Sequence, residues 1–101
     1  MKITGVELTS VKIPYRRNHT LSYGPMSGTE STFVRLRTDE GVDGYGEASI
    51  PGGPFWSEEF TGTVRSVIRK YLAPAIVGLD PTSPRNVAMT MRNAVRGHPF
   101  A

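Results

Sequence analysis

The chain has 101 residues, of which 38% are hydrophobic and 21% are charged, and these are the size and composition of one small globular domain. It contains no cysteine, which excludes a disulfide framework, and its net charge of +3 comes from Lys and Arg residues scattered along the chain, which argues against nucleic-acid binding. The apolar stretch over residues 71–79 is too short to span a membrane and no signal-like apolar run opens the chain, so we expect a cytoplasmic protein without a membrane partner.

The first predicted element is a strand over residues 1–14, because polar and apolar residues alternate there. The apolar positions change parity midway along it, which indicates an inserted residue, so we expect a β-bulge near residues 9–10. Pro14 should end the strand pairing because proline has no N–H to donate. Residues 15–30 have no hydrophobic period and contain several turn-forming residues, so they are expected to form a long loop.

A β-hairpin is predicted next. Residues 31–38 and 42–48 have the composition of strands, and the Thr-Asp-Glu-Gly segment at 38–41 is typical of a tight turn whose glycine takes a positive φ. Gly44 and Gly46 share one face of the second strand, where the missing side chains would allow a helix to pack closely. With the first strand, this hairpin makes a three-stranded antiparallel meander.

A helix is predicted after a second loop over residues 49–56. Ser57 is the expected N-cap, and Glu58 and Glu59 follow it in the first turn, where the helix dipole favours anions. Pro74 should stop this helix. Apolar residues recur at helical spacing and are predicted to form its core face: Phe60, Val64, Val67, Ile68, Tyr71 and Leu72.

A second helix is predicted after a connector at residues 80–84. Ser83 should cap it, Pro84 suits its first position, and Gly97 should close it. Its expected apolar stripe is Val87, Met91, Ala94 and Val95. Because the strands precede the helices, the predicted fold class is α+β, with a helical pair packed on one face of the meander.

The sequence contains no motif of a known catalytic or metal centre. It has no phosphate-binding loop, no nucleophile elbow and no pair of histidines at metal-ligand spacing. His19 and His98 lie far apart in the sequence, which is typical of surface or packed histidines. We therefore assign no catalytic residue and no metal ligand to this chain.

The two predicted loops carry more aromatic and apolar residues than simple connections need. One interpretation is that these residues form a small cluster on the edge of the domain itself. The other is that the two loops close over a bound substrate, since binding residues are often carried on loops. On the second interpretation, the substrate-binding residues are His19, Tyr23, Met26, Ile50, Phe55 and Trp56.

Several short segments carry a resemblance to a known family. They are Met1-Lys2-Ile3, the Arg-Asn-His-Thr-Leu-Ser run at 17–22, the turn at 38–41, the Gly-Tyr-Gly-Glu-Ala strand at 44–48, the Gly-Gly-Pro-Phe-Trp-Ser-Glu-Glu run at 52–59, Tyr-Leu-Ala-Pro at 71–74, Gly-Leu-Asp-Pro at 78–81 and Gly-His-Pro-Phe-Ala at 97–101. In order and spacing these segments resemble the N-terminal capping domain of the enolase superfamily, in its muconate-lactonizing and mandelate-racemase-like branch.

This resemblance implies a larger enzyme in which residues 1–101 cap a (β/α) barrel that lies beyond this chain. The barrel would bind Mg²⁺ and supply the catalytic bases, and the ion would stabilise the enolate formed when a proton α to a carboxylate is removed. The implied reaction is that of an isomerase, either muconate cycloisomerase-like or, as the alternative, a racemase or epimerase of an amino-acid derivative. The implied partners are a small carboxylate substrate, the chain's own barrel and further copies in a homo-oligomer.

Two non-catalytic alternatives stay open at this point. The chain could be a stand-alone α+β binding module whose loops hold a small ligand, or an interaction protein whose apolar sheet face docks a partner chain. On the enzyme hypothesis the 101-residue chain alone is inactive, because no catalytic residue lies within it.

Overall fold

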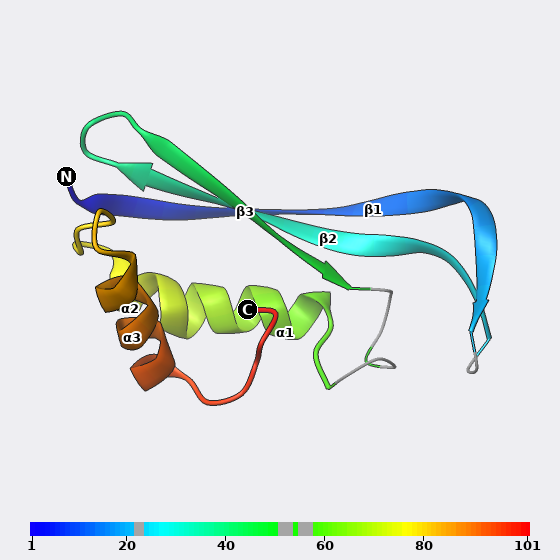
Figure 1. Ribbon diagram of the computed structural model, residues 1–101. Coiled ribbons are helices and arrows are strands. Elements are labelled where there is room, and N and C mark those ends of the chain that lie inside the picture. The colour runs from blue at the N-terminus through cyan, green and yellow to red at the C-terminus, as the bar shows by residue number, and fades with distance from the viewer. Residues whose placement is uncertain (22–23, 51–53, 55–57) are drawn as a thin grey trace.

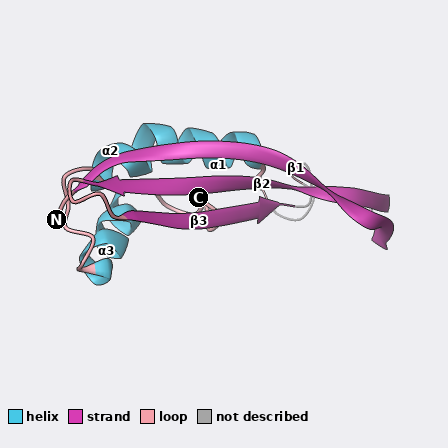
Figure 2. Ribbon diagram, turned by 90° about the horizontal axis from the view of Figure 1, so that it is seen from above, coloured by secondary structure: helices cyan, strands magenta, loops and turns pink. Residues whose placement is uncertain are grey.

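The computed structural model describes residues 1–21, 24–50, 54 and 58–101, with only the backbone at 18–21 and 24–27. The strands are β1 (Ile3–Leu21), β2 (Gly24–Thr38) and β3 (Asp43–Ile50), and they form one antiparallel sheet in chain order. The helices are α1 (Thr61–Val67), the π-helical turn η1 (Ile68–Leu72), α2 (Ala73–Ile76) and α3 (Pro84–Ala94). The helices cover one face of the sheet (Figure 1), whose three strands lie side by side with β2 in the middle (Figure 2), so the α+β prediction is confirmed.

The hairpin of β1 and β2 extends well past the helical layer (Figure 1). The last paired residues are Leu21 and Gly24, so the loop predicted over residues 15–30 is wrong: every described residue of that range lies on a strand. Beyond the helices neither face of a hairpin has a core to cover, so its residues need not alternate between polar and apolar. The hydrophobic pattern therefore carries no strand signal there.

Pro14 does not end β1. It lies opposite Gly28, and pairing resumes at His19 after a register shift. A Cβ atom on Gly28 would lie 2.9 Å from the Cα of Pro14 and closer still to the carbonyl oxygen of Ile13. The absence of that atom lets β2 approach β1 closely at the proline, so the hairpin continues past the missing N–H.

The predicted bulge near residues 9–10 is also wrong. The ladder of β1 with β2 is continuous there, and the register shifts lie close to Ile3 and after Pro14. Val11 and Ile13 occupy the face of β1 opposite to the helices, where they are 39% and 42% exposed. The change of parity in the sequence thus reflects two apolar residues on the outer face and not an inserted residue.

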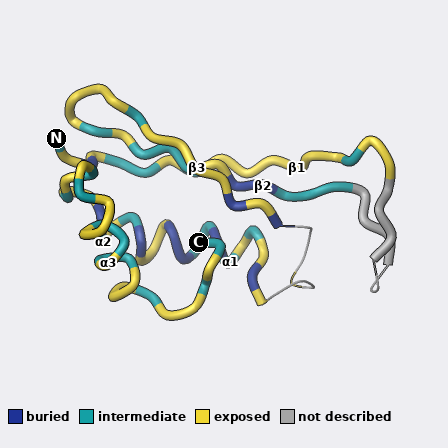
Figure 3. The backbone as a smooth tube through the Cα atoms, viewed as in Figure 1, coloured by how far each residue is buried: buried dark blue, intermediate teal, exposed yellow. Residues whose placement is uncertain are grey.

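The elements α1, η1 and α2 follow one another without a gap, and we call them together the first helical segment. The core lies between the inner face of the sheet and this segment, as the buried stretches in Figure 3 show. It consists of Ala48, Ile50, Val64, Val67, Ile68 and Leu72, each at most 9% exposed. Fully burying one aliphatic side chain stabilises a fold by roughly 1.5–3 kcal/mol. Phe60 and Tyr71 are 40% and 57% exposed, so their predicted place in the core is wrong. Phe60 precedes the first helical residue, and Tyr71 lies in the π-helical turn, where the wider turn shifts the face that a side chain occupies.

The first helical segment begins later than predicted. Ser57, the predicted N-cap, lies outside the described residues, whereas Glu58 and Glu59 precede the helix. Phe60 is the N-cap residue, and its N–H donates to Oγ1 of Thr63 at 2.9 Å. The first-turn role predicted for the two glutamates is therefore wrong.

Pro74 does not stop the first helical segment, because a π-helical turn comes directly before it. The N–H of Ala73 bonds to the carbonyl of Ile68, five residues earlier, and Pro74 then stands in the first turn of α2. A proline inside a continuous α-helix removes one hydrogen bond and clashes with the carbonyl four residues before it. The widened turn accommodates the ring, so the chain stays helical up to Ile76.

The second predicted helix is α3, and its position agrees with the prediction. Of the predicted apolar stripe, Met91 and Val95 pack against the core and Val87 is half-buried, whereas Ala94 is exposed, so its place in the stripe is wrong. Ser83 holds the N-cap position of α3, although its side chain makes no capping hydrogen bond, and Pro84 stands in the first turn. The helix ends at Ala94, and Gly97 then takes a φ of +69°. None of the helices in the described part of the chain has the length and apolar character needed to cross a membrane.

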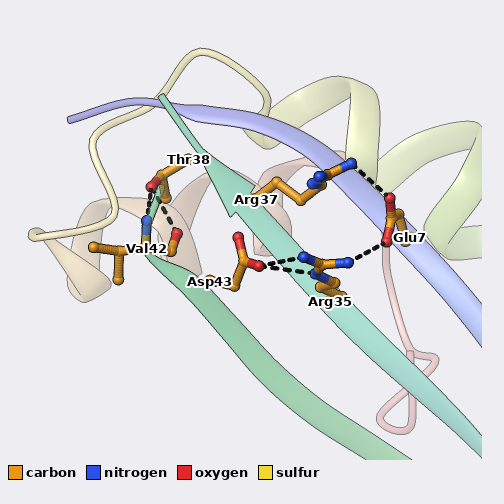
Figure 4. A network of polar contacts seen from close by, with 6 residues as sticks. All are labelled: Glu7, Arg35, Arg37, Thr38, Val42 and Asp43. Atoms are coloured by element: carbon orange, nitrogen blue, oxygen red, sulfur yellow. Dashed lines mark hydrogen bonds and ion pairs between the residues drawn. The ribbon is translucent and has the colours of Figure 1, made fainter. Parts of the chain in front are cut away.

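The hairpin of β2 and β3 turns as predicted. Gly41 has a φ of +76°, and Oγ1 of Thr38 donates to the carbonyl oxygen of Val42 at 2.6 Å and accepts its N–H at 3.2 Å (Figure 4). The third strand runs two residues further than the predicted end at residue 48. Local turn chemistry was therefore sufficient to locate this hairpin.

An ion-pair network crosses all three strands on the outer face of the sheet (Figure 4). Arg35 of β2 bonds to Asp43 of β3 through Nε at 2.9 Å and to Glu7 of β1 through Nη1 at 3.4 Å, and Arg37 bonds to the same Glu7 at 3.0 Å. The hydrogen bonds and the charge of Asp43 raise the pKa of the Arg35 guanidinium above its ordinary value.

Gly44 and Gly46 face the helical side of the sheet, but no helix packs closely on them. They lie opposite Leu36 and Val34, and a Cβ atom built on either glycine would have no described heavy atom within 4 Å. The space above them is an open pocket of about 290 Å³ that Met91 of α3 also lines. The predicted close approach of a helix at these glycines is therefore wrong.

Candidate functional site

The segments that carry the predicted site residues start from one end of the domain. At that end the projecting part of β1 and β2 leaves the helical layer, β3 finishes and α1 begins (Figure 1). Glu30 of β2 lies opposite Ile50, the last residue of β3, and its carboxylate accepts a hydrogen bond at 2.5 Å from the hydroxyl of Thr61, the first residue of α1. We call this meeting point of Glu30, Ile50 and Thr61 the junction.

Further polar contacts fix the junction to the sheet. The hydroxyl oxygens of Ser10 on β1 and Thr32 on β2 lie 2.9 Å apart, and Nη1 of Arg65 on α1 donates to the hydroxyl of Ser10 at 2.9 Å. Thr32 itself is 1% exposed. The base of the projecting hairpin is therefore held by both the sheet and the first helix.

The predicted site residues have different positions relative to the junction. His19 and Met26 lie opposite each other in the ladder of β1 with β2, further out along the projecting hairpin. Tyr23, Phe55 and Trp56 lie outside the described residues. Ile50 is the one whose side chain is described: it is 2% exposed and belongs to the core cluster, so any contact that it makes with a ligand stays a prediction.

A buried carboxylate next to the junction escaped the sequence analysis. The side chain of Glu59 is 0% exposed and lies 3.2 Å from Nδ1 of His98, and it accepts the backbone N–H of Phe100 at 2.6 Å. Its partners are 39 and 41 residues away in the sequence. No local pattern could have shown this contact, because Glu59 follows another glutamate in an apparently simple acidic pair.

The described residues offer no metal centre. Among them no group of three or more His, Cys, Asp or Glu side chains comes together in a way that could hold an ion. Mg²⁺ requires several oxygen ligands in near-octahedral geometry, usually with carboxylates among them. The described side chains thus do not fit a bound Mg²⁺, and no chemical step is assigned to such an ion on this chain.

The fold and the sequence together define the class of protein. Residues 3–101 match the family described as "Mandelate racemase / muconate lactonizing enzyme, N-terminal domain". The chain belongs to this family, and it is an N-terminal capping domain of the enolase superfamily.

Individual relatives agree with this assignment. The chain is 36% identical over 98 residues to the chloromuconate cycloisomerase of Pseudomonas putida, and the matched region covers 97% of this chain and 26% of that protein. It is 33% identical over 104 residues to the N-succinyl-L-Arg/Lys racemase of Bacillus cereus, covering 100% of this chain and 27% of that protein. The chain therefore spans about a quarter of the length of these relatives.

Solved structures give the same result. The muconate lactonizing enzyme of Pseudomonas fluorescens, complexed with muconolactone, superposes with a TM-score of 0.94 at 26% identity, over 98% of this chain and 27% of that one. The dipeptide epimerase of Enterococcus faecalis V583, complexed with Mg and the dipeptide L-Leu-L-Tyr, superposes with a TM-score of 0.86 at 28% identity, over 99% of this chain and 27% of that one. Relatives of both reaction types thus share this domain.

Proposed function

We propose that this chain is the capping part of a larger Mg²⁺-dependent isomerase that removes a proton α to a carboxylate, and that the reaction is muconate cycloisomerase-like. The observation that carries the proposal is the match of nearly the whole chain to this domain family, together with the origin of both predicted binding segments at one junction. A barrel that follows residue 101 supplies the metal ligands and the catalytic bases. The bound Mg²⁺ supplies electrostatic stabilisation of the enolate.

The task of the chain itself is to cover the substrate. In this proposal His19 and Met26 on the projecting hairpin contact the distal part of the substrate. Tyr23, Phe55 and Trp56, which lie outside the described residues, are proposed to contact it as well. Aromatic side chains provide a large contact area at a small cost in conformational entropy, and a closed cover excludes water from the reacting centre. Both segments start at the junction, which supports the proposal that they act on one substrate.

The substrate proposed for this site is a small carboxylate. Arg16 and Arg17 are exposed on the projecting hairpin, close in sequence to His19, and guanidinium groups bind carboxylates strongly through paired hydrogen bonds. A diacid such as a muconate carries a carboxylate at its far end. In the cell, we propose a cytoplasmic homo-oligomer of the complete enzyme.

The alternative reaction is racemisation or epimerisation of an amino-acid derivative. It is favoured by the similarity to the N-succinyl-L-Arg/Lys racemase, which is only slightly lower than that to the cycloisomerases. Incubating the full-length protein with each substrate in D₂O separates the two. Lactone formation from muconate supports the first proposal, whereas deuterium entering the α-carbon of an amino-acid derivative, without lactone formation, reverses the ranking. A full-length protein that catalyses neither reaction would refute both proposals.

The role of the aromatic residues has its own test. In the full-length enzyme, Tyr23→Ala or Trp56→Ala should change the ratio of kcat/KM between two substrates about tenfold, which corresponds to about 1.4 kcal/mol. The melting temperature should change little. If Trp56 instead packs against the domain itself, Trp56→Ala will lower stability by about 3–5 kcal/mol and leave the substrate ratio unchanged.

A further inference from the structure

Glu59 combines features that a solvent-exposed acidic residue before a helix does not have. Its side chain is completely buried, and both carboxylate oxygens have partners: Oε1 lies 3.2 Å from Nδ1 of His98, and Oε2 accepts the N–H of Phe100 at 2.6 Å. Burying a carboxylate is costly unless hydrogen bonds or opposite charges compensate for the lost water. The contacts with residues 98 and 100 therefore contribute to keeping this side chain inside.

The segment that Glu59 holds has an unusual backbone. Gly97 and His98 have consecutive positive φ values of +69° and +57°, and His98 is the one non-glycine residue with a positive φ in the described part of the chain. Such a conformation is uncommon for a residue with a side chain and is energetically unfavourable. The N–H of Ala101 bonds back to the carbonyl of His98 at 3.2 Å, so residues 98–101 form a turn.

The far end of this turn is attached to the domain. Phe100 and Ala101 pack against the hydrophobic core, and the short hydrogen bond from the N–H of Phe100 fixes the turn to Glu59. A hydrogen bond to a charged acceptor is roughly twice as strong as one between neutral groups. One buried carboxylate thus connects the start of the first helical segment to a turn about forty positions later in the sequence.

We infer that Glu59 is a positioning residue: its carboxylate clamps the turn at residues 97–101 to the N-terminal end of α1 and thereby fixes the helix end that carries Thr61. Thr61 is the α1 residue of the junction, where its hydroxyl bonds to Glu30 at the base of the projecting hairpin. The inference deepens the proposed function and rests on it only where substrate binding is concerned. We call this arrangement the Glu59 clamp.

The clamp itself is tested by amide hydrogen exchange, followed by mass spectrometry on the full-length protein. In Glu59→Ala the N–H of Phe100 loses its acceptor, and its exchange should accelerate at least tenfold relative to the parent, while Glu59→Gln keeps a neutral acceptor and should accelerate it less. The amide of Val64, which bonds to the carbonyl of Phe60 at 3.0 Å, serves as the internal reference and should change little. Glu58→Gln, at the exposed neighbouring residue, is the matched control and should leave both amides unchanged.

A second pair of variants leaves the buried carboxylate in place. The side chain of His98 is 36% exposed, so His98→Ala should fold, and it should accelerate exchange at Phe100 because the ring contact is lost. His98→Asn should restore protection, since asparagine tolerates a positive φ and offers an amide donor near the position of Nδ1. The clamp is overturned if exchange at Phe100 stays at the parental rate in both Glu59→Ala and His98→Ala, or if exchange at Val64 rises to the same extent.

Steady-state kinetics test the positioning role. In the full-length enzyme, Glu59→Gln should raise KM about tenfold and change kcat less than twofold, because a displaced junction moves the base of the projecting hairpin and weakens substrate binding before it affects the chemistry. Unchanged KM in an active enzyme whose Phe100 amide has lost protection would overturn the positioning role. If the parental protein turns over neither substrate class, the proposed function fails, and the exchange measurements still decide whether the clamp exists.

Discussion

Filling the open pocket above β3 should stabilise this domain. Gly46 lies opposite Val34 on the helix-facing side of the sheet, and a Cβ atom built on it meets no described heavy atom within 4 Å. Its φ lies outside the left-handed range, so alanine can adopt the same backbone conformation. We therefore predict that Gly46→Ala raises the free energy of unfolding.

The magnitude follows from two contributions. Replacing glycine by alanine at a compatible position stabilises by about 0.4–1 kcal/mol, because the unfolded chain loses conformational freedom. A fully buried methyl group adds about 0.8 kcal/mol, of which we count about half because Gly46 is itself exposed. The sum is about 1 kcal/mol, which corresponds to a rise in Tm of about 4–8 °C for a domain of this size.

The assay is urea denaturation and thermal melting, with Gly41→Ala as the matched control. Gly41 also has free space around its Cα, but its φ is +76°, so alanine there should destabilise by about 1 kcal/mol or more. The two positions differ in backbone conformation, whereas the new Cβ atom would meet no described heavy atom within 4 Å at either of them. A Gly46→Ala protein that is less stable than the parent would refute the reasoning, because it would mean that the pocket is filled.

Three further predictions concern the core, an acidic turn and the outer face. Val64→Ala, at a residue that is 0% exposed, should lower the free energy of unfolding by about 2 kcal/mol. Phe60→Ala, at a residue that is 40% exposed, should cost less than the roughly 3–5 kcal/mol of a buried aromatic, and a full loss of that size in urea titrations, or no loss in Val64→Ala, would contradict the assignment of the core. The side-chain and backbone hydrogen bonds from Thr82 lower the pKa of Asp80 below its ordinary value of 3.8, so this carboxylate stabilises the fold above that pH, and its contribution is lost as the pH falls through the lowered pKa. Asp80→Asn should thus reduce Tm at pH 7, and the difference in Tm should shrink as the pH is lowered below 3.8, whereas a constant difference would contradict this. Arg35→Gln should lower the free energy of unfolding only slightly, and the loss should shrink in 1 M salt, because the ion pairs are partly exposed; a loss independent of salt would exclude an electrostatic origin.

The candidate site could be predicted from the sequence only as two groups of residues on separate segments. Their relation depends on Glu30, Ile50 and Thr61, which come from three elements and meet only through strand pairing and one hydrogen bond. Glu59 illustrates the limit of sequence reasoning more strongly. Nothing in its neighbourhood distinguishes it from Glu58, and only the folded chain places one carboxylate in water and the other against His98 and Phe100.

The sequence by itself determined the elements whose causes are local. The turn before β3 follows from a glycine that can adopt a positive φ, the start of α3 from Pro84 in its first turn, and the buried face of the first helical segment from apolar residues at helical spacing. The order and spacing of short motifs were also sufficient to identify the family.

Only the tertiary structure decided the features that depend on distant partners. β1 continues past Pro14 because Gly28, on the neighbouring strand, leaves room for close approach, and the helix continues through Pro74 because the preceding turn widens. The projecting hairpin has no core to cover, so its strands leave no hydrophobic pattern, and the pairing of its two halves is what keeps them extended. Backbone hydrogen bonds of this kind depend on which chain segment lies alongside, and a residue's own sequence neighbours do not determine that.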